Sequence, residues 1–223
     1  MEKNKPKIAI DGPAGAGKST VAREVSRRLG IKYLDTGAMY RAITLKVLRE
    51  NIKLEDTTAL VRVLENTKIQ LGDDNGVFLD GEDVTEEIRS SGVNGLVSPV
   101  SAISSVRRHL VSVQQAIAAE SDGIIMEGRD IGSRVMPDAD YKFYLDASIE
   151  ERARRRCREQ LEKGITLSLE AVGAEIKNRD NIDSQREDSP LTIVDDALVV
   201  DTTGMTFDEV VDKIVETVYG GQR

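Results

Sequence analysis

Eight residues near the start of the chain have the types and spacing of a phosphate-binding loop. They run from Gly12 to Ser19 and match the pattern GxxxxGK[ST]. Glycines in such a loop let the backbone turn tightly and aim its N–H groups at phosphate oxygens. Lys18 can reach the β- and γ-phosphates, and the Ser19 hydroxyl can bind Mg²⁺, in part through water. The motif predicts a nucleoside triphosphate site made of Gly12, Pro13, Ala14, Gly15, Ala16, Gly17, Lys18, Ser19 and Thr20.

The residues on either side of the motif fit this interpretation. Residues 7–10 form a short apolar run typical of a buried strand. Val21, Val25 and Leu29 then recur at the spacing of one helix face, and Gly30 predicts the end of that helix. A chance match to the motif has a probability on the order of 1% in a chain of this length, and the strand–loop–helix context lowers it further.

The composition indicates one α/β domain with an excess of acidic groups. The 223 residues are 39% hydrophobic and 31% charged, and the net charge is −8. This charge, an aromatic content of 4% and the absence of Trp disfavour a nucleic-acid partner. The single cysteine, Cys157, excludes an internal disulfide, and the single histidine, His109, has no partners at metal-ligand spacing.

No signal-peptide pattern and no run of 18 apolar residues is present, so we expect a cytoplasmic protein that does not enter a membrane. Five short apolar runs predict buried parallel strands at residues 7–10, 32–34, 124–126, 141–145 and 197–200. Helical patterns separate them. Alternating strands and helices predict a doubly wound α/β sheet whose binding crevice lies at the carboxyl ends of the strands.

Three helix starts and one insertion complete the predicted organisation. A helix over residues 100–120 follows Ser98-Pro99 as its cap and first turn, and capping boxes at 148–151 and 206–209 open two more. Residues 67–84 break the alternation, because two β-like runs surround an Asn-Gly-containing turn. This pattern predicts a hairpin in a small β insertion.

Polar residues follow two of the predicted strands. Residues 35–37 lead to Tyr40 and Arg41, and residues 127–130 read Glu-Gly-Arg-Asp. In an α/β sheet these positions face the ligand. We therefore expect both groups to line the binding crevice.

Two arginine-rich helices are ambiguous on their own. Arg179, Asp183 and Arg186 fall at i, i+4 and i+7 on one face of a predicted helix that starts near residue 168. Arg152 and Arg156 share one side of an earlier helix. Each pattern alone is more typical of a solvated, salt-bridged surface than of a binding site. In an acidic chain, however, such a concentration of arginine suggests further anion binding.

Taken together, these segments resemble bacterial cytidylate kinases. The resemblance is carried by residues 11–20, 35–41, 80–89, 127–132 and 178–180 with Arg186, and it runs in order over essentially the whole chain. The DGxDVT segment at 80–85 resembles the nucleotide-binding insertion of the bacterial enzymes. The chain departs from the family pattern at Thr36, where serine is commoner, and at Glu127, where aspartate is commoner.

The resemblance implies the nucleoside monophosphate kinase fold, with a five-stranded parallel sheet flanked by helices. It implies one domain over residues 1–223, comprising a P-loop core, a monophosphate-binding insertion at about 62–95 and a mobile lid at about 150–168. It also implies transfer of the γ-phosphate of ATP to CMP or dCMP, with Mg²⁺ as cofactor. We expect a monomer whose partners are these small molecules.

The site residues follow from the same resemblance, position by position. Arg41 and Arg129 match positions that hold the acceptor phosphate. The cytosine positions match Thr36, Arg107, Asp130 and Arg186, and the sugar positions match Ser98, Arg179 and Asp183. The expected catalytic cations are Lys18, Arg129, Arg152 and Arg156, although the arginine run between 152 and 158 allows several registers in the lid.

Elementary chemistry agrees with these roles. Two polyanions must be brought together, and the planar fork of arginine binds two phosphate oxygens at once. A phosphate monoester with a second pKa of about 6 is already dianionic at neutral pH, so no catalytic histidine is required. Cytosine offers acceptors at O2 and N3, which suit arginine, and an amine at N4, which suits Asp130 or Thr36. Uracil reverses the pattern at N3 and at position 4, so it would leave buried groups unpaired.

Three other functions share some of these features. A P-loop kinase acting on AMP, UMP or shikimate would have the same loop and arginines. A GTPase switch would need a guanine-reading NKxD, which is absent, and the DxxG match at residues 201–204 lies far from its expected position. A nucleic-acid machine is disfavoured by the acidic charge.

Overall fold

The computed structural model describes residues 5–72, 76–162 and 164–221. A five-stranded parallel sheet has the order β2-β6-β1-β7-β8. Its strands are β1 (Lys7–Asp11), β2 (Lys32–Asp35), β6 (Ile124–Gly128), β7 (Tyr141–Asp146) and β8 (Leu198–Asp201). All five predicted strands are confirmed, and so is the predicted fold class of a parallel sheet flanked by helices with a small β insertion.

The strand register places the polar strand ends at one edge of the sheet. Asp35 of β2 is opposite Glu127 of β6, and Asp11 of β1 is opposite Gly128. β6 is buried along its whole length, which explains why its sequence is a continuous apolar run until Glu127. The groups expected to line the crevice therefore lie side by side at the carboxyl ends of the strands.

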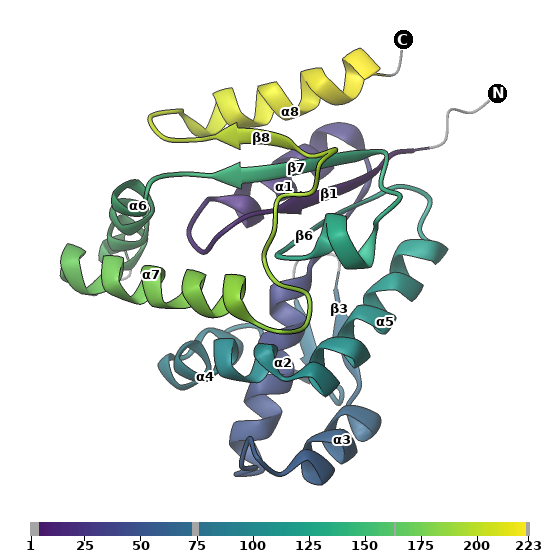
Figure 1. The fold of residues 1–223 in the computed structure, drawn as a ribbon, viewed down its shortest axis with the longest axis vertical. Helices are drawn as coiled ribbons and strands as arrows, with labels where there is room; N and C mark the ends of the chain where they lie inside the picture. Colours follow the sequence, from purple (N-terminus) through teal and green to yellow (C-terminus); the bar gives the residue numbers. More distant parts are fainter. Residues whose placement is uncertain (1–4, 73–75, 163, 222–223) are drawn as a thin grey trace.

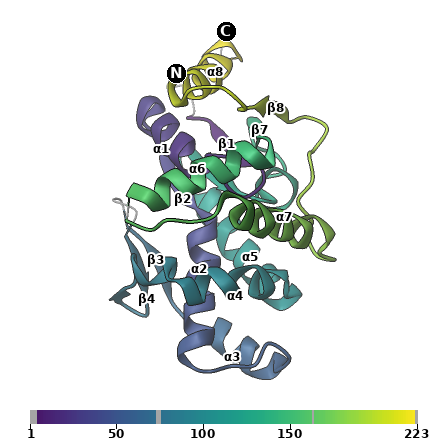
Figure 2. The ribbon, with the colours of Figure 1, turned by 90° about the vertical axis from the view of Figure 1, so that its left-hand side faces the viewer.

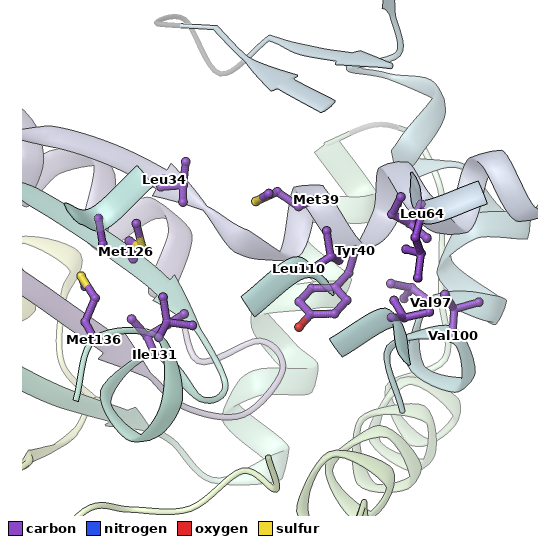
Figure 3. Packing of buried hydrophobic residues seen from close by; sticks show 14 of the residues in the cluster. Leu34, Met39, Tyr40, Leu64, Val97, Val100, Leu110, Met126, Ile131 and Met136 are labelled. Atoms are coloured by element: carbon purple, nitrogen blue, oxygen red, sulfur yellow. The ribbon is translucent and has the colours of Figure 1, made fainter. Parts of the chain in front are cut away.

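Helices cover both faces of the sheet (Figure 1). On one face, α1 (Lys18–Leu29) and α8 (Phe207–Gly221) pack together over an apolar cluster that includes Val25 and Ile214. Gly30 ends α1 in the left-handed conformation, with φ 63°, as predicted. On the other face, α2 (Thr36–Arg49) and α5 (Ser104–Glu120) pack against β6, and Figure 3 shows Met39, Leu110 and Met126 in that cluster.

The predicted helix over residues 100–120 is wrong at its start. The structure has two helices, α4 (Ser91–Ala102) and α5, which are separated by the extended residue Ile103. Ser98 and Pro99 lie inside α4 and do not open α5. The apolar period continues across the break because Val100 and Val106 belong to the same core cluster. Periodicity alone therefore could not detect a one-residue interruption.

The predicted hairpin is confirmed, with one strand more than expected. β3 (Ile69–Leu71), β4 (Val77–Leu79) and β5 (Glu82–Asp83) form an antiparallel sheet in that order. Asp80 and Gly81 join β4 to β5 with φ values of 53° and 88°, as a two-residue hairpin turn requires. The Asn-Gly turn falls partly on Asn75, which lies outside the described residues.

The β insertion is connected to α2 by ion pairs of Arg49. Arg49 of α2 donates to Glu82 at 2.7 Å and also bonds Glu87 in a short helical turn, η1 (Glu87–Arg89). Figure 2 shows β3 and β4 beside α2 and α4, with α3 (Thr57–Asn66) at the end of the molecule away from α8. Arg49 therefore links the β insertion to α2.

A helix pair lies beside the phosphate-binding loop. α6 (Ile149–Glu162) and α7 (Leu169–Gln185) lie next to each other (Figure 1). The predicted capping box of α6 forms only by half: the Ser148 hydroxyl accepts the Glu151 N–H at 3.2 Å, but the Glu151 carboxylate bonds Arg155 instead of returning to Ser148. The box between Thr206 and Glu209 at the start of α8 forms in both directions.

Candidate active site

The loop between β1 and α1 depends on glycine at specific positions. Gly12, Gly15 and Gly17 have φ values of 148°, 77° and 86°, a region that side chains rarely adopt. A Cβ on Gly12 would lie 2.0 Å from the carbonyl oxygen of Leu145. We call residues 12–19 the donor loop.

Lys18 and Ser19 of the donor loop bond to groups within the protein. Lys18 is buried, and its Nζ donates to the Pro13 carbonyl at 2.7 Å. The Ser19 hydroxyl donates to Glu127 Oε1 at 2.5 Å. Burial and the nearby charge of Arg129 lower the pKa of Lys18, while burial and the charge of Asp35 raise the pKa of Glu127. The side chains of Lys18 and Ser19 are thus hydrogen-bonded within the protein.

Arg152 lies against the donor loop and not on a solvated surface. Its Nη1 donates to the Ala14 carbonyl at 2.9 Å and to Asp180 at 2.6 Å, and its Nε donates to the Ala147 carbonyl at 2.9 Å. Asp180 also accepts the Ala14 N–H at 3.3 Å. The N–H and the carbonyl of Ala14 are therefore both held by hydrogen bonds. The alternative that this arginine-rich helix face is a solvated, salt-bridged surface is wrong for Arg152, which is buried. Arg154 is exposed, as that alternative expected.

Arg156 contributes charge without a bonded partner. It is partly buried, and within the described part of the chain it has no hydrogen bond or ion pair. Its charge lowers the pKa values of Arg41 and Arg179, for which burial is the largest cause, and Arg129 acts on both in the same sense. Mutual repulsion among buried cations is unfavourable unless an anion joins them. The arrangement is therefore suited to bind phosphate.

A pocket opens at the carboxyl ends of β2 and β6. We call it the acceptor pocket; it is lined by Thr36, Gly37, Tyr40, Val97, Ser101, Arg107, Glu127, Gly128, Arg129, Asp130, Arg179, Asp183 and Arg186. The structure brings together all the predicted CMP-binding residues here except Arg41 and Ser98. Asp183 and Arg186 are buried, so the solvated-surface alternative for this helix face is wrong as well.

Ion pairs connect the charged residues of the acceptor pocket. Arg129 Nε donates to Asp183 at 2.8 Å, and Arg107 bonds Asp130. Arg186 lies 3.9 Å from Asp130 and 3.6 Å from Asp183. Burial alone would raise the pKa of Asp183, but the charges of the neighbouring arginines hold it below its usual value. Both carboxylates are therefore fixed by arginines from different elements.

Several buried polar atoms of the acceptor pocket have no hydrogen-bond partner in the described part of the chain. They are the Tyr40 hydroxyl, Arg107 Nε, Arg179 Nε and Arg186 Nη2. Arg107 also lies over the Tyr40 ring, 5.3 Å from its centre. Buried donors without acceptors are costly, so their concentration in one pocket indicates a polar ligand that supplies acceptors.

Two predicted residues lie outside the lining. Arg41 donates to the Asn94 side-chain oxygen at 2.6 Å and to the Ile88 carbonyl at 3.2 Å. Ser98 is buried in α4, and its carbonyl accepts the Ser101 hydroxyl at 3.0 Å. Ser101 lines the pocket in its place, three residues later on the same helix.

Sequence reasoning missed the residues that support the site. Asp11 accepts the N–H groups of Ile131 and Gly132 at 2.9 and 2.7 Å, and burial raises its pKa to about 6. Asp180 holds the donor loop as described above. Asp11 stands directly before the glycine motif and Asp180 directly after Arg179 in segments already singled out. Adjacency to those motifs was the available signal, but it did not reveal the partners.

The DGxDVT segment forms a turn within the insertion. Thr85 donates from its N–H and its hydroxyl to Asp83 at 2.9 and 2.6 Å, and accepts the Val77 N–H at 2.9 Å. The hollow beside it is lined in part by Asp83, Glu86 and Glu87. The side chains of the motif thus build the insertion.

Ser19 and Glu127 are chemically suited to bind a divalent metal together with a substrate. Their oxygens already touch, and hydroxyl and carboxylate oxygens are ligands that Mg²⁺ accepts together with substrate phosphates and water. Over the described ranges, no group of three His, Cys, Asp or Glu residues could hold a metal ion by itself. In the same ranges, no helix has the length and apolar character needed to cross a bilayer.

Comparison with known proteins agrees with the sequence resemblance. A family model described as cytidylate kinase matches residues 8–219. A cytidylate kinase of Caldanaerobacter subterraneus subsp. tengcongensis is 56% identical over 95% of this chain and 94% of its own length, and one of Alkaliphilus oremlandii is 48% identical over 96% and 97%. A gluconokinase from Sinorhizobium meliloti shares the fold, with a TM-score of 0.50, 12% identity and full coverage of both chains.

Proposed function

The chain belongs to the cytidylate kinase family, and from this premise we propose how its described residues act. The protein transfers the γ-phosphate of ATP to CMP or dCMP and releases ADP and CDP or dCDP. We assign ATP to the donor loop and the monophosphate to the acceptor pocket. One observation carries this assignment: Glu127 lines the acceptor pocket and also accepts the Ser19 hydroxyl of the donor loop at 2.5 Å. The two sites therefore adjoin each other.

On the donor side, backbone N–H groups of residues 15–19 and the dipole of α1 bind the phosphates of ATP. Lys18 exchanges its bond with the Pro13 carbonyl for the β- and γ-phosphates. Its buried charge, in a site of low dielectric constant, stabilises the charge that develops on the transferring group. Arg152 and Asp180 hold the Ala14 peptide groups in place, which makes Arg152 a positioning residue in this proposal.

On the acceptor side, Arg41 and Arg129 bind the phosphate of CMP. Arg156 adds charge from α6, as its effect on the pKa of Arg41 indicates. The phosphate is already a dianion at neutral pH, so its oxygen attacks without a general base. Positioning and charge stabilisation then supply the rate in an in-line transfer with a loose transition state.

The base is read by a network of three charged side chains. Arg107 and Arg186 both face Asp130 and both carry a buried nitrogen without a partner. We assign cytosine O2 and N3 to these arginines and the N4 amine to Asp130 or the Thr36 hydroxyl. Arg179, Asp183 and Ser98 are assigned to the sugar; for Ser98, the lining position of Ser101 supports α4 as the element that contacts the ligand.

We assign the divalent cation to Mg²⁺, held by Ser19 and Glu127 together with ATP oxygens. When bound, it supplies charge neutralisation between the phosphates. The sequence predicted only Ser19 as a ligand of the metal, and the hydrogen bond between Ser19 and Glu127 adds Glu127 to the proposed site.

We also propose a monomer in the cytoplasm. The residues assigned to both substrates belong to one chain, which supports the monomer.

The domain organisation is proposed as one unit that comprises the P-loop core, a monophosphate-binding insertion and a mobile lid. The insertion at about 62–95 is proposed to contribute to monophosphate binding. Its η1 supports this role, because the Ile88 carbonyl accepts a hydrogen bond from Arg41. Residues 150–162 and 164–168 act as the lid, which excludes water as the competing acceptor. Hydrogen exchange in α6 should slow when a bisubstrate analogue binds. Unchanged exchange there would remove the lid from the proposal.

A substrate panel tests the function directly. Initial rates of ADP release are measured with Mg²⁺-ATP and, in turn, CMP, dCMP, UMP, AMP and shikimate, with ATP alone as the control for hydrolysis. We expect CMP and dCMP to be turned over at least about tenfold faster than UMP, because UMP leaves buried groups unpaired. Turnover of AMP or shikimate with no pyrimidine product would overturn the proposal.

A further inference from the structure

Arg41 differs from Arg129 in the kind of group that holds it. Arg129 donates to a carboxylate, that of Asp183, at 2.8 Å. Arg41 donates from Nη1 to the side-chain oxygen of Asn94 at 2.6 Å and to the Ile88 carbonyl at 3.2 Å. Both of these acceptors are uncharged. No carboxylate among the described residues forms an ion pair with Arg41.

Asn94 is held in one orientation. Its Nδ2 donates to the Arg89 carbonyl at 2.9 Å, and its backbone N–H donates to the Ser90 carbonyl at 2.9 Å in the first turn of α4. A guanidinium has only donors and a carbonyl has only acceptors, so the amide can satisfy both neighbours in one orientation alone. The side-chain oxygen of Asn94 is therefore aimed at Arg41.

The charge of Arg41 remains available to a ligand. Burial lowers its pKa, and the charges of Arg89, Arg156 and Arg129 act in the same direction, with partial compensation from Asp35. Its Nε and Nη2 have no hydrogen-bond partner in the described part of the chain. A phosphate dianion can use both of those donors, because a guanidinium binds two oxygens at once.

We propose that Asn94 is a positioning residue that aims Arg41 at the acceptor phosphate without cancelling its charge. This inference rests on the proposed function, in which Arg41 binds the phosphate of CMP. A carboxylate at this position would also hold the guanidinium, but it would compete with the phosphate for the positive charge. An apolar side chain would leave the guanidinium free to adopt other rotamers, so binding would have to order it.

The experiment compares dissociation constants of CMP, measured by calorimetry without ATP, for the wild type, Asn94→Ala, Asn94→Asp, Arg41→Met and the double variant Asn94→Ala/Arg41→Met. We expect Asn94→Ala to weaken CMP about tenfold and Asn94→Asp at least as much. In the Arg41→Met background the Asn94→Ala change should add less than about twofold. Asn66→Ala is the matched control, because Asn66 also donates to a backbone carbonyl but is exposed.

A second ligand separates positioning from a merely structural role. Cytidine lacks the phosphate, so its affinity, followed by saturation-transfer NMR, should not change in Asn94→Ala. The KM for ATP should also stay constant. Equal weakening of cytidine and CMP, or wild-type affinity for CMP in Asn94→Asp, would overturn the inference. If Arg41→Met binds CMP with wild-type affinity, both the proposed role of Arg41 and the inference about Asn94 are wrong. If Arg41→Met weakens CMP binding but Asn94→Ala does not, only the inference about Asn94 is wrong.

Discussion

The donor loop and the acceptor pocket differ in how completely their polar groups are bonded. In the donor loop, Lys18 has the Pro13 carbonyl and Ser19 has Glu127. In the acceptor pocket, Tyr40, Arg107, Arg179 and Arg186 each keep a buried polar atom without a hydrogen-bond partner in the described part of the chain. The difference concerns side chains: those of Lys18 and Ser19 have hydrogen-bond partners, whereas four acceptor-pocket side chains each keep one buried atom without a partner in the described part of the chain.

Each site therefore has a different source of specificity. The donor loop is built from backbone and near neighbours, so it binds a feature that every nucleoside triphosphate has. The acceptor pocket joins side chains from α2, α4, α5, α7 and the end of β6, and its unpaired atoms must be matched by a particular ligand. We expect ATP to exchange the existing side-chain bonds of Lys18 and Ser19, and CMP to supply acceptors for side-chain atoms that have none.

The largest effect is expected on the donor side. Lys18→Met keeps the bulk of the side chain and removes its charge, so turnover should fall about 10³-fold. The dissociation constant of CMP should not change, because Lys18 is not among the lining residues of the acceptor pocket. Quenched-flow assays of CDP formation and calorimetry check the two statements. Wild-type turnover in a folded variant would refute the role of Lys18.

The free energy of unfolding should depend on pH through Asp11, which stands next to the donor loop and whose carboxyl bonds residues next to the acceptor pocket. Burial raises the pKa of Asp11 from 3.8 to about 6, so the folded state holds a proton that the unfolded state has lost between these values. The contribution of Asp11 to stability is present below pH 3.8 and is lost as the pH rises through 6, a change of about 3 kcal/mol. Asp11→Asn removes it.

Urea unfolding at pH values from 4 to 7 measures this effect. Whatever the offset at pH 4, the stability of Asp11→Asn relative to the wild type should increase by up to about 3 kcal/mol by pH 7. Asp138→Asn, the same change at an exposed residue, is the control. A flat difference for Asp11→Asn would show that its carboxylate titrates normally.

The acceptor side should lose selectivity when Asp130 changes. Asp130→Ala removes the carboxylate between Arg107 and Arg186, and the ratio of kcat/KM for CMP over UMP should fall at least about tenfold. Asp130→Ala leaves two buried arginines without their partner and could unfold the protein. Asp130→Asn is therefore a second variant, which removes the charge and keeps nearly the same side-chain volume. Circular dichroism verifies folding. Full discrimination in both folded variants would exclude Asp130 from base recognition.

The smallest effect is expected where α6 meets the donor loop. Gly15 and Gly204 have nearly equal φ values, 77° and 75°, but a Cβ on Gly15 would lie 3.3 Å from the Arg152 Cβ, and one on Gly204 would meet nothing within 4 Å. Both alanine variants should lose about 1 kcal/mol of unfolding free energy from backbone strain. Only Gly15→Ala should also raise the KM for ATP. Identical KM values would show that this contact does not influence the loop.

Much of the fold could be predicted from the sequence because local patterns determine it. Strands buried on both faces give continuous apolar runs, and Gly30 ends α1 in a conformation that suits glycine. The break at Ile103 could not be predicted in this way, because α4 and α5 pack on one core. Tertiary contact, not local preference, decides where those helices meet.

The sequence predicted which residues belong to the site better than it predicted which groups those residues contact. The family resemblance identified Arg107, Asp130 and Arg186 by position, and the structure brings them into one pocket. It could not indicate that Arg152 is bonded to Ala14, which lies 138 residues earlier in the chain. Helix periodicity gives a face, but the partner of that face comes from another element.

The central claim is that the unpaired groups of the acceptor pocket are matched by cytosine. Calorimetric titration of the enzyme with CMP and with UMP, in the absence of ATP, tests it most directly. We expect CMP to bind at least about 100-fold more tightly than UMP, because UMP reverses the donors and acceptors at N3 and at position 4. Equal dissociation constants for the two nucleotides would contradict it.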